Sequence, residues 1–464
     1  MQFNSFAFLV FFATFYLVYR CCSHRHQNHL LLLASYLFYG AWDYRFMALI
    51  VGSTVVNYLL GRGIAMAATP QARRSYLVLG IASNLGFLGF FKYYNFFADS
   101  LAAALFALGW GEHHFSLSII LPIGISFYTF QIIGYIVDVY KNKTTPASTF
   151  LDFAIFIAFF PQICAGPISR ASALLPQISH PRNISGHLVK ASSALFLFGL
   201  FEKTVVADNL APLVDSVYQN SNPDGVSVLI ATYAFAVQIF ADFDGYSNMA
   251  KGLAGIMGFT LVTNFHAPYF SSTPSEFWNR WHISLSSWLR DYLYIPLGGN
   301  RLGGWYTARN LFTTMVLGGL WHGASWMFIF WGTFHGLLLA AYLPLRNRLD
   351  SLPGWIQKLF CFHLICFGWM LFKTTSISQF SRLVESLLFN FHFHAFAANW
   401  ILIKQVFFYS AIPLTYQYLQ YRKNLEQPLA SWPVGCRATA YLVLFYMIVI
   451  FGFSEAQSFI YFRF

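Results

Sequence analysis

The sequence predicts an all-α polytopic membrane protein with roughly 11–12 transmembrane helices. Of its 464 residues, 57% are hydrophobic and 10% are charged, whereas an ordinary soluble domain carries about 25% charged residues. The shortage of charge extends along the whole chain. Apolar segments recur that can cross a bilayer of about 30 Å, which takes about 20 helical residues. These observations exclude a water-soluble enzyme, a disordered tail and a fibrous repeat.

The apolar segments predict about twelve membrane helices. In chain order they cover residues 5–19, 30–42, 46–60, 75–94, 119–137, 188–207, 227–247, 308–322, 325–343, 355–373, 400–418 and 438–455. The apolar run at 96–109 predicts an interfacial helix rather than a further span. No positively charged region precedes the first run, so we interpret it as a membrane helix and not as a cleavable signal peptide.

Two segments differ from plain membrane helices. The run FFPQICAGPISR at 159–170 contains two prolines and a glycine, which break an α-helix. Residues 276–309 form the most polar and basic part of the chain. Non-helical backbone is tolerated at membrane depth only where protein or a wet cavity surrounds it. Both segments are therefore predicted to be re-entrant.

The charges of the loops predict the orientation of the chain. Basic residues fall in alternate loops, whereas the loop at 208–225 contains three aspartates and no Lys or Arg. The positive-inside rule then places both termini and this acidic loop outside. Lys373 and Arg382 also fall outside, against the rule. The net charge of +11 is divided among short loop clusters rather than one stripe, so no nucleic acid partner is expected.

Several familiar site motifs are missing. The six cysteines show neither a paired framework nor zinc spacing, and no HExxH, Walker motif or nucleophile elbow occurs. The SHRHQNH run at 23–29 lies in a basic loop, so we interpret it as a solvated turn rather than a metal site. The sequence argues against a zinc protease, an ATPase and a serine hydrolase, and no metal is expected.

His322 is the strongest catalytic candidate. It lies in LGGLWHGASW, between Gly319 and Gly323, and glycines leave room for another molecule to approach the imidazole. A neutral histidine in a dry site can take a proton from a hydroxyl or thiol near pH 7. The alternative is a structural histidine hydrogen-bonded between helices.

Two further histidines lie near His322 in the sequence. His282, in FWNRWHISLSSW beside Arg280 and Arg290, either assists at a site or bonds to its own neighbours. His335 follows His322 by 13 residues, which is more than three helical turns at about 3.6 residues per turn. We therefore interpret His335 as structural.

Ionisable residues at membrane depth are candidates for a site. Asp242 and Asp244, followed by Tyr246, predict a polar cavity, although a transporter's ion site has the same pattern. Glu202 and Lys203 are adjacent and are expected to neutralise each other near a helix end.

The chain ends in FIYFRF, in which Tyr461 lies among aromatic residues. An aromatic residue at this position is typical of an interfacial anchor. The alternative is a nucleophilic hydroxyl at the outer mouth of a channel.

Several long strings together resemble the membrane-bound O-acyltransferase family. They are NLGFLGFFKYYNFF, LPIGISFYTFQIIGYIVDVY, FFPQICAGPISR, EFWNRWHISLSSWLRDYLYIPLGGNR and LGGLWHGASWMFIFWGTFHG, with a further match in FIYFRF. The resemblance runs from about residue 84 to 336 and returns at 459–464, and it is greatest to the bacterial branch of the alginate O-acetylation membrane subunit. It implies a single membrane-embedded domain over 1–464, with a helical funnel and a tunnel.

The resemblance also implies roles for individual residues. His322, in the WHG string, is the family's essential histidine, and His282, in the RWHIS string, is its second histidine. Related members that act in teichoic-acid D-alanylation imply that Tyr461 is a transient acyl carrier. This chain departs from the family's DFSGYSDMA string by reading DFDGYSNMA, with Asp244 and Asn248 at the changed positions.

The implied activity is transfer of an acetyl group from cytoplasmic acetyl-CoA to an extracytoplasmic glycan, with His322 as general base. The acceptors left open are an alginate-like exopolysaccharide, cellulose and peptidoglycan. Four arginines would bind the phosphates of coenzyme A at the cytoplasmic mouth, namely Arg280, Arg290, Arg301 and Arg309. Trp321 would exclude water, and Asp242 and Tyr246 would contribute to substrate binding.

Acetyl-CoA is expected as a substrate and no cofactor as tightly bound. Relatives pass the group to an extracytoplasmic SGNH-hydrolase-like acetyltransferase, so a separate partner of that kind is expected at a bacterial inner membrane. Two other hypotheses remain: a channel or transporter, which often has internal repeats that we do not find here, and a non-catalytic scaffold subunit of a polysaccharide-secretion complex. The scaffold predicts that His322 is replaceable.

Overall fold

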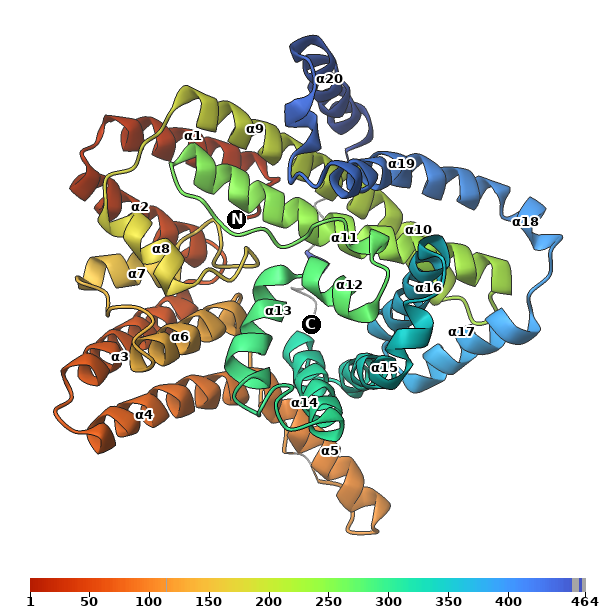
Figure 1. The fold of residues 1–464 in the computed structure, drawn as a ribbon, viewed down its shortest axis with the longest axis horizontal. Helices are drawn as coiled ribbons and strands as arrows, with labels where there is room; N and C mark the ends of the chain where they lie inside the picture. The colour runs from red at the N-terminus through yellow and green to blue at the C-terminus, as the bar shows by residue number, and fades with distance from the viewer. Residues whose placement is uncertain (114, 453–458, 461–464) are drawn as a thin grey trace. The chain divides into compact units, whose positions relative to one another are not determined.

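The computed structural model describes residues 1–113, 115–452, 459 and 460, and every regular element within these ranges is a helix (Figure 1). The chain forms two compact units. The first unit contains Met1–Val189 and Leu253–Val262, and the second contains Lys190–Gly252 and Thr263–Phe464.

Three α-helices of the first unit begin with side-chain caps that the sequence supplies. Ser5, Thr69 and Thr149 each accept a hydrogen bond from a backbone N–H in the first turn of the following helix, which satisfies one of the unpaired donors there. The helices are α1 (Phe6–Cys21), α2 (His24–Gly40), α3 (Met47–Met66), α4 (Pro70–Leu88), α5 (Tyr94–Ala107), α6 (Ile125–Tyr140), α7 (Phe150–Ala158) and α8 (Ala171–Ser179). Within this unit α4 packs on α3 and α6, and α7 packs on α2.

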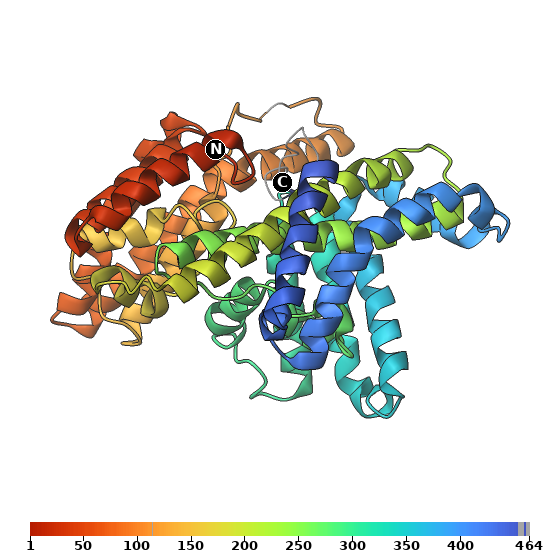
Figure 2. The ribbon, with the colours of Figure 1, turned by 90° about the horizontal axis from the view of Figure 1, so that it is seen from above.

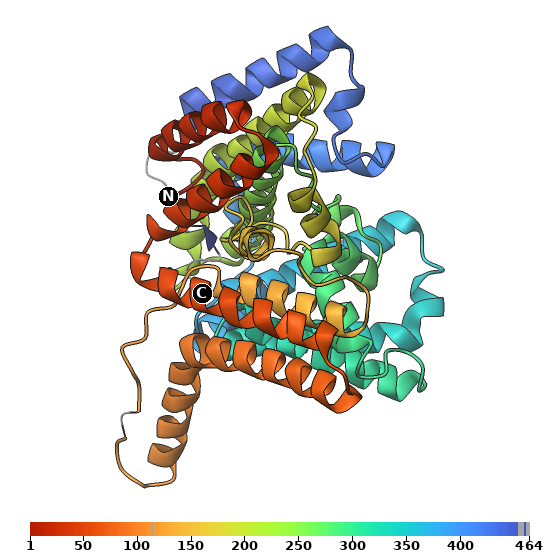
Figure 3. The same cartoon turned by 90° about the vertical axis from the view of Figure 1, so that its left-hand side faces the viewer.

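The run predicted as a separate interfacial helix at 96–109 is continuous with α4. The π-helical turn η2 (Gly89–Tyr93) joins α4 to α5, so that residues 70–107 form one apolar helical stretch of 38 residues. Figure 3 shows the helix axis changing direction at this turn. The sequence has no proline between α4 and α5 to end the helix, and a π turn is a common cause of such a bend.

The prediction that 159–170 interrupts the helices is confirmed. Helix α7 ends at Ala158 and α8 begins at Ala171, with turns between them. The carbonyl of Phe156, near the end of α7, accepts hydrogen bonds from the side-chain amides of Gln131 at 2.7 Å and Gln162 at 3.2 Å. Side chains thus satisfy a backbone group that the broken helix leaves unpaired.

The second unit contains the remaining helices. They are α9 (Gly186–Phe201, which begins in the first unit), η3 (Glu202–Ala207), α10 (Asp208–Tyr218), α11 (Gly225–Ile256, which ends in the first unit), η4 (Pro268–Phe270), α12 (Pro274–Arg280), α13 (Ile283–Leu289), η5 (Arg290–Tyr294), α14 (Gly304–His322), α15 (Trp326–Leu349), α16 (Gly354–Lys373), α17 (Ile377–Phe389), α18 (Ala395–Ala398), α19 (Trp400–Lys423), η6 (Pro428–Ser431) and α20 (Val434–Phe451). The segment predicted to be re-entrant at 276–309 contains most of α12, then α13, η5, the turns after them and the beginning of α14. Figure 2 shows α15 and α16 as neighbouring helices joined by a short turn.

Helix α11 is the most buried of the long apolar helices, since 89% of an 18-residue apolar stretch within it is buried. Beside it lies α9 (Figure 1), and the two backbones meet at Gly245 and Gly199. A Cβ atom built on Gly245 would lie 2.7 Å from the carbonyl oxygen of Gly199. Small residues permit such close approach between membrane helices.

Each of the twelve predicted apolar segments overlaps a helix within the residues that the structure describes. Six stretches there are long and apolar enough to cross a membrane: Tyr44–Met66, Pro70–Ala107, Gly225–Ile256, Trp326–Leu349, Gly354–Lys373 and Val434–Phe451. Shorter apolar helices occur at Phe6–Cys21 and Ile125–Tyr140. The all-α polytopic fold is confirmed, and a total near twelve crossings stays a prediction.

Candidate active site

Two histidines that lie 40 residues apart in the sequence come together in the second unit. His322 is the last residue of α14, and His282 immediately precedes α13. Their ring centroids are 6.5 Å apart, and the ring of Trp321 lies 5.9 Å from His282 and 5.1 Å from His322. Only 1% of His282 and 5% of His322 is exposed. The arrangement is a buried pair of imidazoles beside an indole.

The backbone of His282 has a left-handed conformation, with φ of 43°, which is uncommon for residues other than glycine. The following residues are held by Asn264: its carbonyl accepts from the N–H of Ile283 at 2.9 Å, and its Oδ1 accepts from the hydroxyl of Ser284 at 2.6 Å. Asn264 in turn donates to the hydroxyl of Ser247 on α11 at 3.0 Å. Such unfavourable conformations persist where the surroundings fix them, often at functional sites.

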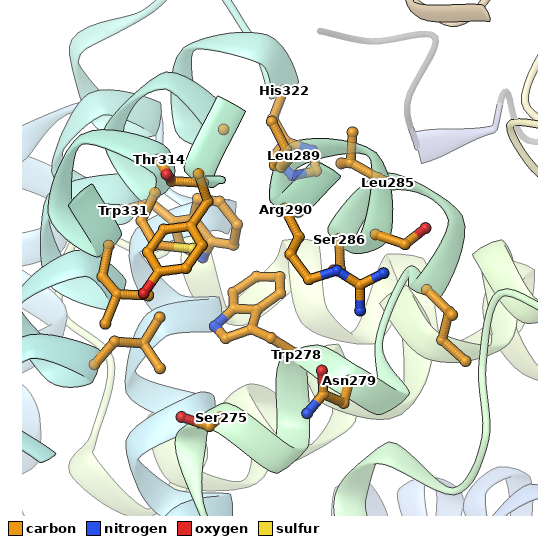
Figure 4. A pocket seen from close by; sticks show the side chains of 17 residues that line it. Ser275, Trp278, Asn279, Leu285, Ser286, Leu289, Arg290, Thr314, His322 and Trp331 are labelled. Carbon is orange, nitrogen blue, oxygen red and sulfur yellow. The ribbon is translucent and has the colours of Figure 1, made fainter. Parts of the chain in front are cut away.

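A cavity of about 320 Å³ opens beside His322. Its walls come from α12, α13, η5, α14 and α15. Apolar and aromatic side chains line it, including Trp278, Met315 and Trp331, together with polar side chains that include Ser275, Asn279 and Ser286. In Figure 4, His322 lies at one end of the cavity and Ser275 and Asn279 lie at the other. A mostly apolar cavity with a few polar groups is typical of a small-molecule site.

Arg290 is the arginine of the predicted cationic mouth that lines this cavity. Its side chain is 60% exposed, and its Nε donates to Asp291 at 2.9 Å. Figure 4 shows its guanidinium group directed toward Asn279 and Ser286. The position leaves a positive charge accessible at the cavity.

The other three predicted arginines are not among the residues that line the cavity. Arg280 forms an ion pair with Glu276 at 2.9 Å and donates to the carbonyl of His266 at 3.2 Å. Arg309 donates to the side-chain oxygen of Asn310 at 2.9 Å. Arg301 is exposed in the turns before α14.

His335 lies behind the cavity wall rather than in it. Its ring contacts the indoles of Trp278 and Trp331, with centroid distances of 5.0 and 4.8 Å, and both indoles line the cavity. Helix α16 leaves space for the imidazole at Gly368, where a Cβ atom would lie 2.6 Å from Nε2 of His335. His335 thus packs against two residues that shape the cavity, as its structural interpretation predicts.

Asp242 and Tyr246, predicted to bind substrate, are not among the residues that line the cavity. Asp242 is 2.6 Å from Nζ of Lys203 and accepts a hydrogen bond from the N–H of Ile460 at 2.7 Å. The ring of Tyr246 packs on that of Phe459, with 4.9 Å between centroids. Both residues therefore contact the C-terminal segment.

The predicted pairing of Glu202 with Lys203 is wrong. Lys203 contacts Asp208 at 2.8 Å and Asp242 at 2.6 Å, whereas Glu202 accepts from the amide of Asn248 at 3.0 Å. Consecutive residues of a helix point in different directions, so that the two side chains reach different partners. Asn248 is one of the two positions at which the chain departs from the family string.

Tyr461 lies outside the described residues. Phe459 and Ile460, which precede it, are described and buried. The sequence did not identify Trp278, Asn279 or Trp331 as cavity residues, although all three occur in strings that carried the resemblance. That resemblance was the signal that could have found them.

Known proteins are similar to this chain in sequence. Residues 147–350 match the sequence profile of MBOAT, the membrane-bound O-acyltransferase family. The chain is 42% identical to the probable alginate O-acetylase AlgI of Azotobacter vinelandii over 83% of this chain and 78% of the relative. It is also 42% identical to the probable alginate O-acetylase AlgI of Pseudomonas aeruginosa, over 83% and 75%. Identity to the peptidoglycan O-acetyltransferase of Helicobacter pylori is 35%, over 77% and 73%.

Proposed function

This chain belongs to the membrane-bound O-acyltransferase family and is a multi-pass membrane O-acetyltransferase, and from this premise we propose that it takes an acetyl group from cytoplasmic acetyl-CoA and passes it across the membrane to an extracytoplasmic glycan. The observation that carries the proposal is the cavity that has His322 at one end and Arg290 on its wall. The pantetheine arm of the donor would enter this cavity, with its phosphates near Arg290.

His322 acts as the general base. It takes the proton of an attacking hydroxyl while the hydroxyl oxygen forms a bond to the acetyl carbonyl carbon. The carbon–sulfur bond then breaks, and the thiolate of coenzyme A receives the proton from the imidazole. Trp321, which lies against both histidines, helps to keep water from hydrolysing the thioester. The role of His282 is to orient the reacting groups beside His322.

The first attacking hydroxyl is that of Tyr461. Acetyl transfer to its phenolic oxygen releases coenzyme A, and a second transfer moves the group to an acceptor outside. The support is that residues 459 and 460 are buried against α11 in the same unit as the histidines. This chain then cooperates with an extracytoplasmic SGNH-hydrolase-like acetyltransferase, in a bacterial inner membrane with both termini outside.

The acceptor is an extracytoplasmic polysaccharide. The relatives with the highest identities given above act, by their names, on alginate, and the Helicobacter pylori relative acts on peptidoglycan. An alginate-like exopolysaccharide is the acceptor that we place first, and peptidoglycan and cellulose are the alternatives to be measured beside it.

The test measures O-acetyl groups on exopolysaccharide, cellulose and peptidoglycan in cells that lack the gene and in cells complemented with variants. We expect wild-type protein to restore acetylation of one polymer and His322→Ala to restore less than about 1% of it, since a general base contributes roughly 10²–10⁴-fold.

The matched control is His335→Gln, which changes a histidine that is also buried but does not line the cavity. Compared at equal abundance in the membrane, it should retain most of the acetylation. Full activity of His322→Ala would contradict the catalytic role and favour a scaffold subunit.

A further inference from the structure

The two described residues of the C-terminal segment lie along one turn of α11. Ile460 and Phe459 are 7% and 2% exposed. The N–H of Ile460 donates to Oδ2 of Asp242 at 2.7 Å. The ring of Phe459 packs against Tyr246 and Phe243, with centroid distances of 4.9 and 5.6 Å. A backbone hydrogen bond and an aromatic contact surface therefore hold these two residues on α11.

Asp242 belongs to a buried group of three charged side chains. Nζ of Lys203 lies 2.6 Å from Oδ1 of Asp242 and 2.8 Å from Oδ1 of Asp208, and each of the three side chains is 5% exposed or less. One lysine therefore contacts two carboxylates. Asp242 directs one oxygen to Lys203 and the other to the N–H of Ile460. Hydrogen bonds to a charged acceptor are stronger than neutral ones.

The same turn of α11 contacts the candidate active site. The ring of Phe243 lies 5.6 Å from that of Phe459 and 4.6 Å from that of His282, and His282 lies 6.5 Å from His322. The anchored residue Ile460 directly precedes Tyr461 in the sequence, and consecutive Cα atoms are about 3.8 Å apart. The hydrogen bond to Asp242 thus fixes the chain immediately before the proposed acyl carrier.

We propose that Asp242 is a positioning residue that sets the register of the C-terminal segment, and that Lys203 holds its carboxylate in place for this task. The proposal rests on the proposed function, in which Tyr461 carries the acetyl group. It gives Asp242 a role different from the substrate binding that the sequence predicted. A shift of the segment by one residue would displace the chain by up to about 3.8 Å.

The test compares Asp242→Asn with Asp208→Asn in the full-length chain. An asparagine at 242 has one oxygen, which cannot serve both Lys203 and Ile460 in their present positions, and Lys203 keeps Asp208 as a counter-charge. The control, Asp208→Asn, removes the other carboxylate that contacts Lys203. It leaves the hydrogen bond from Ile460 to Asp242 in place. Both variants change the buried charge by the same amount.

Docking of the segment is measured by thiol labelling and does not depend on activity. The partly or fully exposed cysteines Cys21, Cys22 and Cys436 are first replaced by serine. Ile460→Cys then supplies one thiol in the segment and keeps the backbone N–H that donates to Asp242. We expect Asp242→Asn to raise the rate of maleimide labelling at this position by about tenfold or more. Asp208→Asn should leave the rate within about twofold of the parent.

Activity is measured as glycan O-acetylation and as release of coenzyme A from acetyl-CoA, at equal abundance in the membrane. We expect Asp242→Asn to lower O-acetylation by about tenfold while slow release of coenzyme A to water continues, and Asp208→Asn to preserve both. A merely structural role for Asp242 would lower both readouts together.

Three results would overturn the positioning role. One is unchanged labelling in Asp242→Asn, another is fast labelling with normal O-acetylation, and the third is equal loss in both aspartate variants. Failure of the proposed function is a separate result, because it appears as full O-acetylation in His322→Ala whatever the labelling rate of the cysteine at 460.

Discussion

At the scale of single residues, Arg290 is the side chain to which the proposed function assigns the phosphates of the donor. It lines the cavity and is 60% exposed. A guanidinium in this position favours a donor with phosphate groups. Because the contact forms when the donor binds and is not altered by acyl transfer, its loss should affect binding more than the chemical step.

Arg290→Gln should raise the KM for acetyl-CoA by about three- to tenfold and change kcat little. The rise should shrink at high salt, because ions screen an exposed charge. The measurement is acetyl-CoA turnover by purified protein in lipid nanodiscs at two ionic strengths. Arg346→Gln is the control, since Arg346 is 69% exposed and paired with Asp350 at 3.3 Å but does not line the cavity. An equal rise in both variants would contradict a local role for Arg290.

The sequence identified the residues of the histidine pair better than it identified the acids. His322 and His282 lie in long strings that resemble one family, and the structure brings them together. An acidic residue in an apolar helix, such as Asp242, can belong to a functional site or to an ion pair, and the sequence pattern does not favour either one. Its partner Lys203 lies 39 residues earlier, so no local pattern reveals the pairing. The contact with Ile460, 218 residues away, was equally invisible.

At the scale of elements, the length of the apolar segments predicted the long helices, but it did not predict the short amphipathic helices. All twelve apolar segments overlap helices, because the cost of unpaired backbone groups in lipid leaves the helix as the available structure. Short elements such as α10, α12 and α17 lack the long apolar run on which that argument depends. The π turn η2 was also missed, because nothing in its composition separates it from the α-helix on either side.

The contact between α9 and α11 depends on two glycines. Gly245→Ala would place a Cβ atom 2.7 Å from the carbonyl oxygen of Gly199 and 3.0 Å from the N of Lys203, so that the two helices must separate. We expect a loss of about 1–3 kcal/mol in stability, measured as a lower temperature of thermal unfolding in detergent. Gly52→Ala in α3, where no atom lies within 4 Å of the added Cβ, should have no such effect. Equal melting temperatures for the two variants would show that the helices do not depend on this contact.

At the scale of the whole molecule, the orientation of the chain in the membrane stays a prediction from its loop charges. Lys373, which the sequence places outside against the positive-inside rule, forms an ion pair of 2.5 Å with Asp215. Asp215 is one of the acids on the segment 208–225 that is expected outside. The positive-inside rule counts Lys and Arg whatever acids lie beside them, so Lys373 still stands against the expected orientation.

The orientation can be tested with single cysteines on two exposed segments. Asn222 lies in the acidic loop before α11, and Gln71 lies near the start of α4 beside the basic residues Arg73 and Arg74. In a chain that lacks the exposed cysteines, a membrane-impermeant maleimide added to spheroplasts should label Asn222→Cys at least about tenfold faster than Gln71→Cys, because the positive-inside rule retains the basic loop in the cytoplasm. Permeabilised membranes should label both positions at similar rates, which shows that each thiol is reactive. The reverse preference in spheroplasts would invert the topology, and it would place the C-terminal segment on the side of the membrane where acetyl-CoA is made.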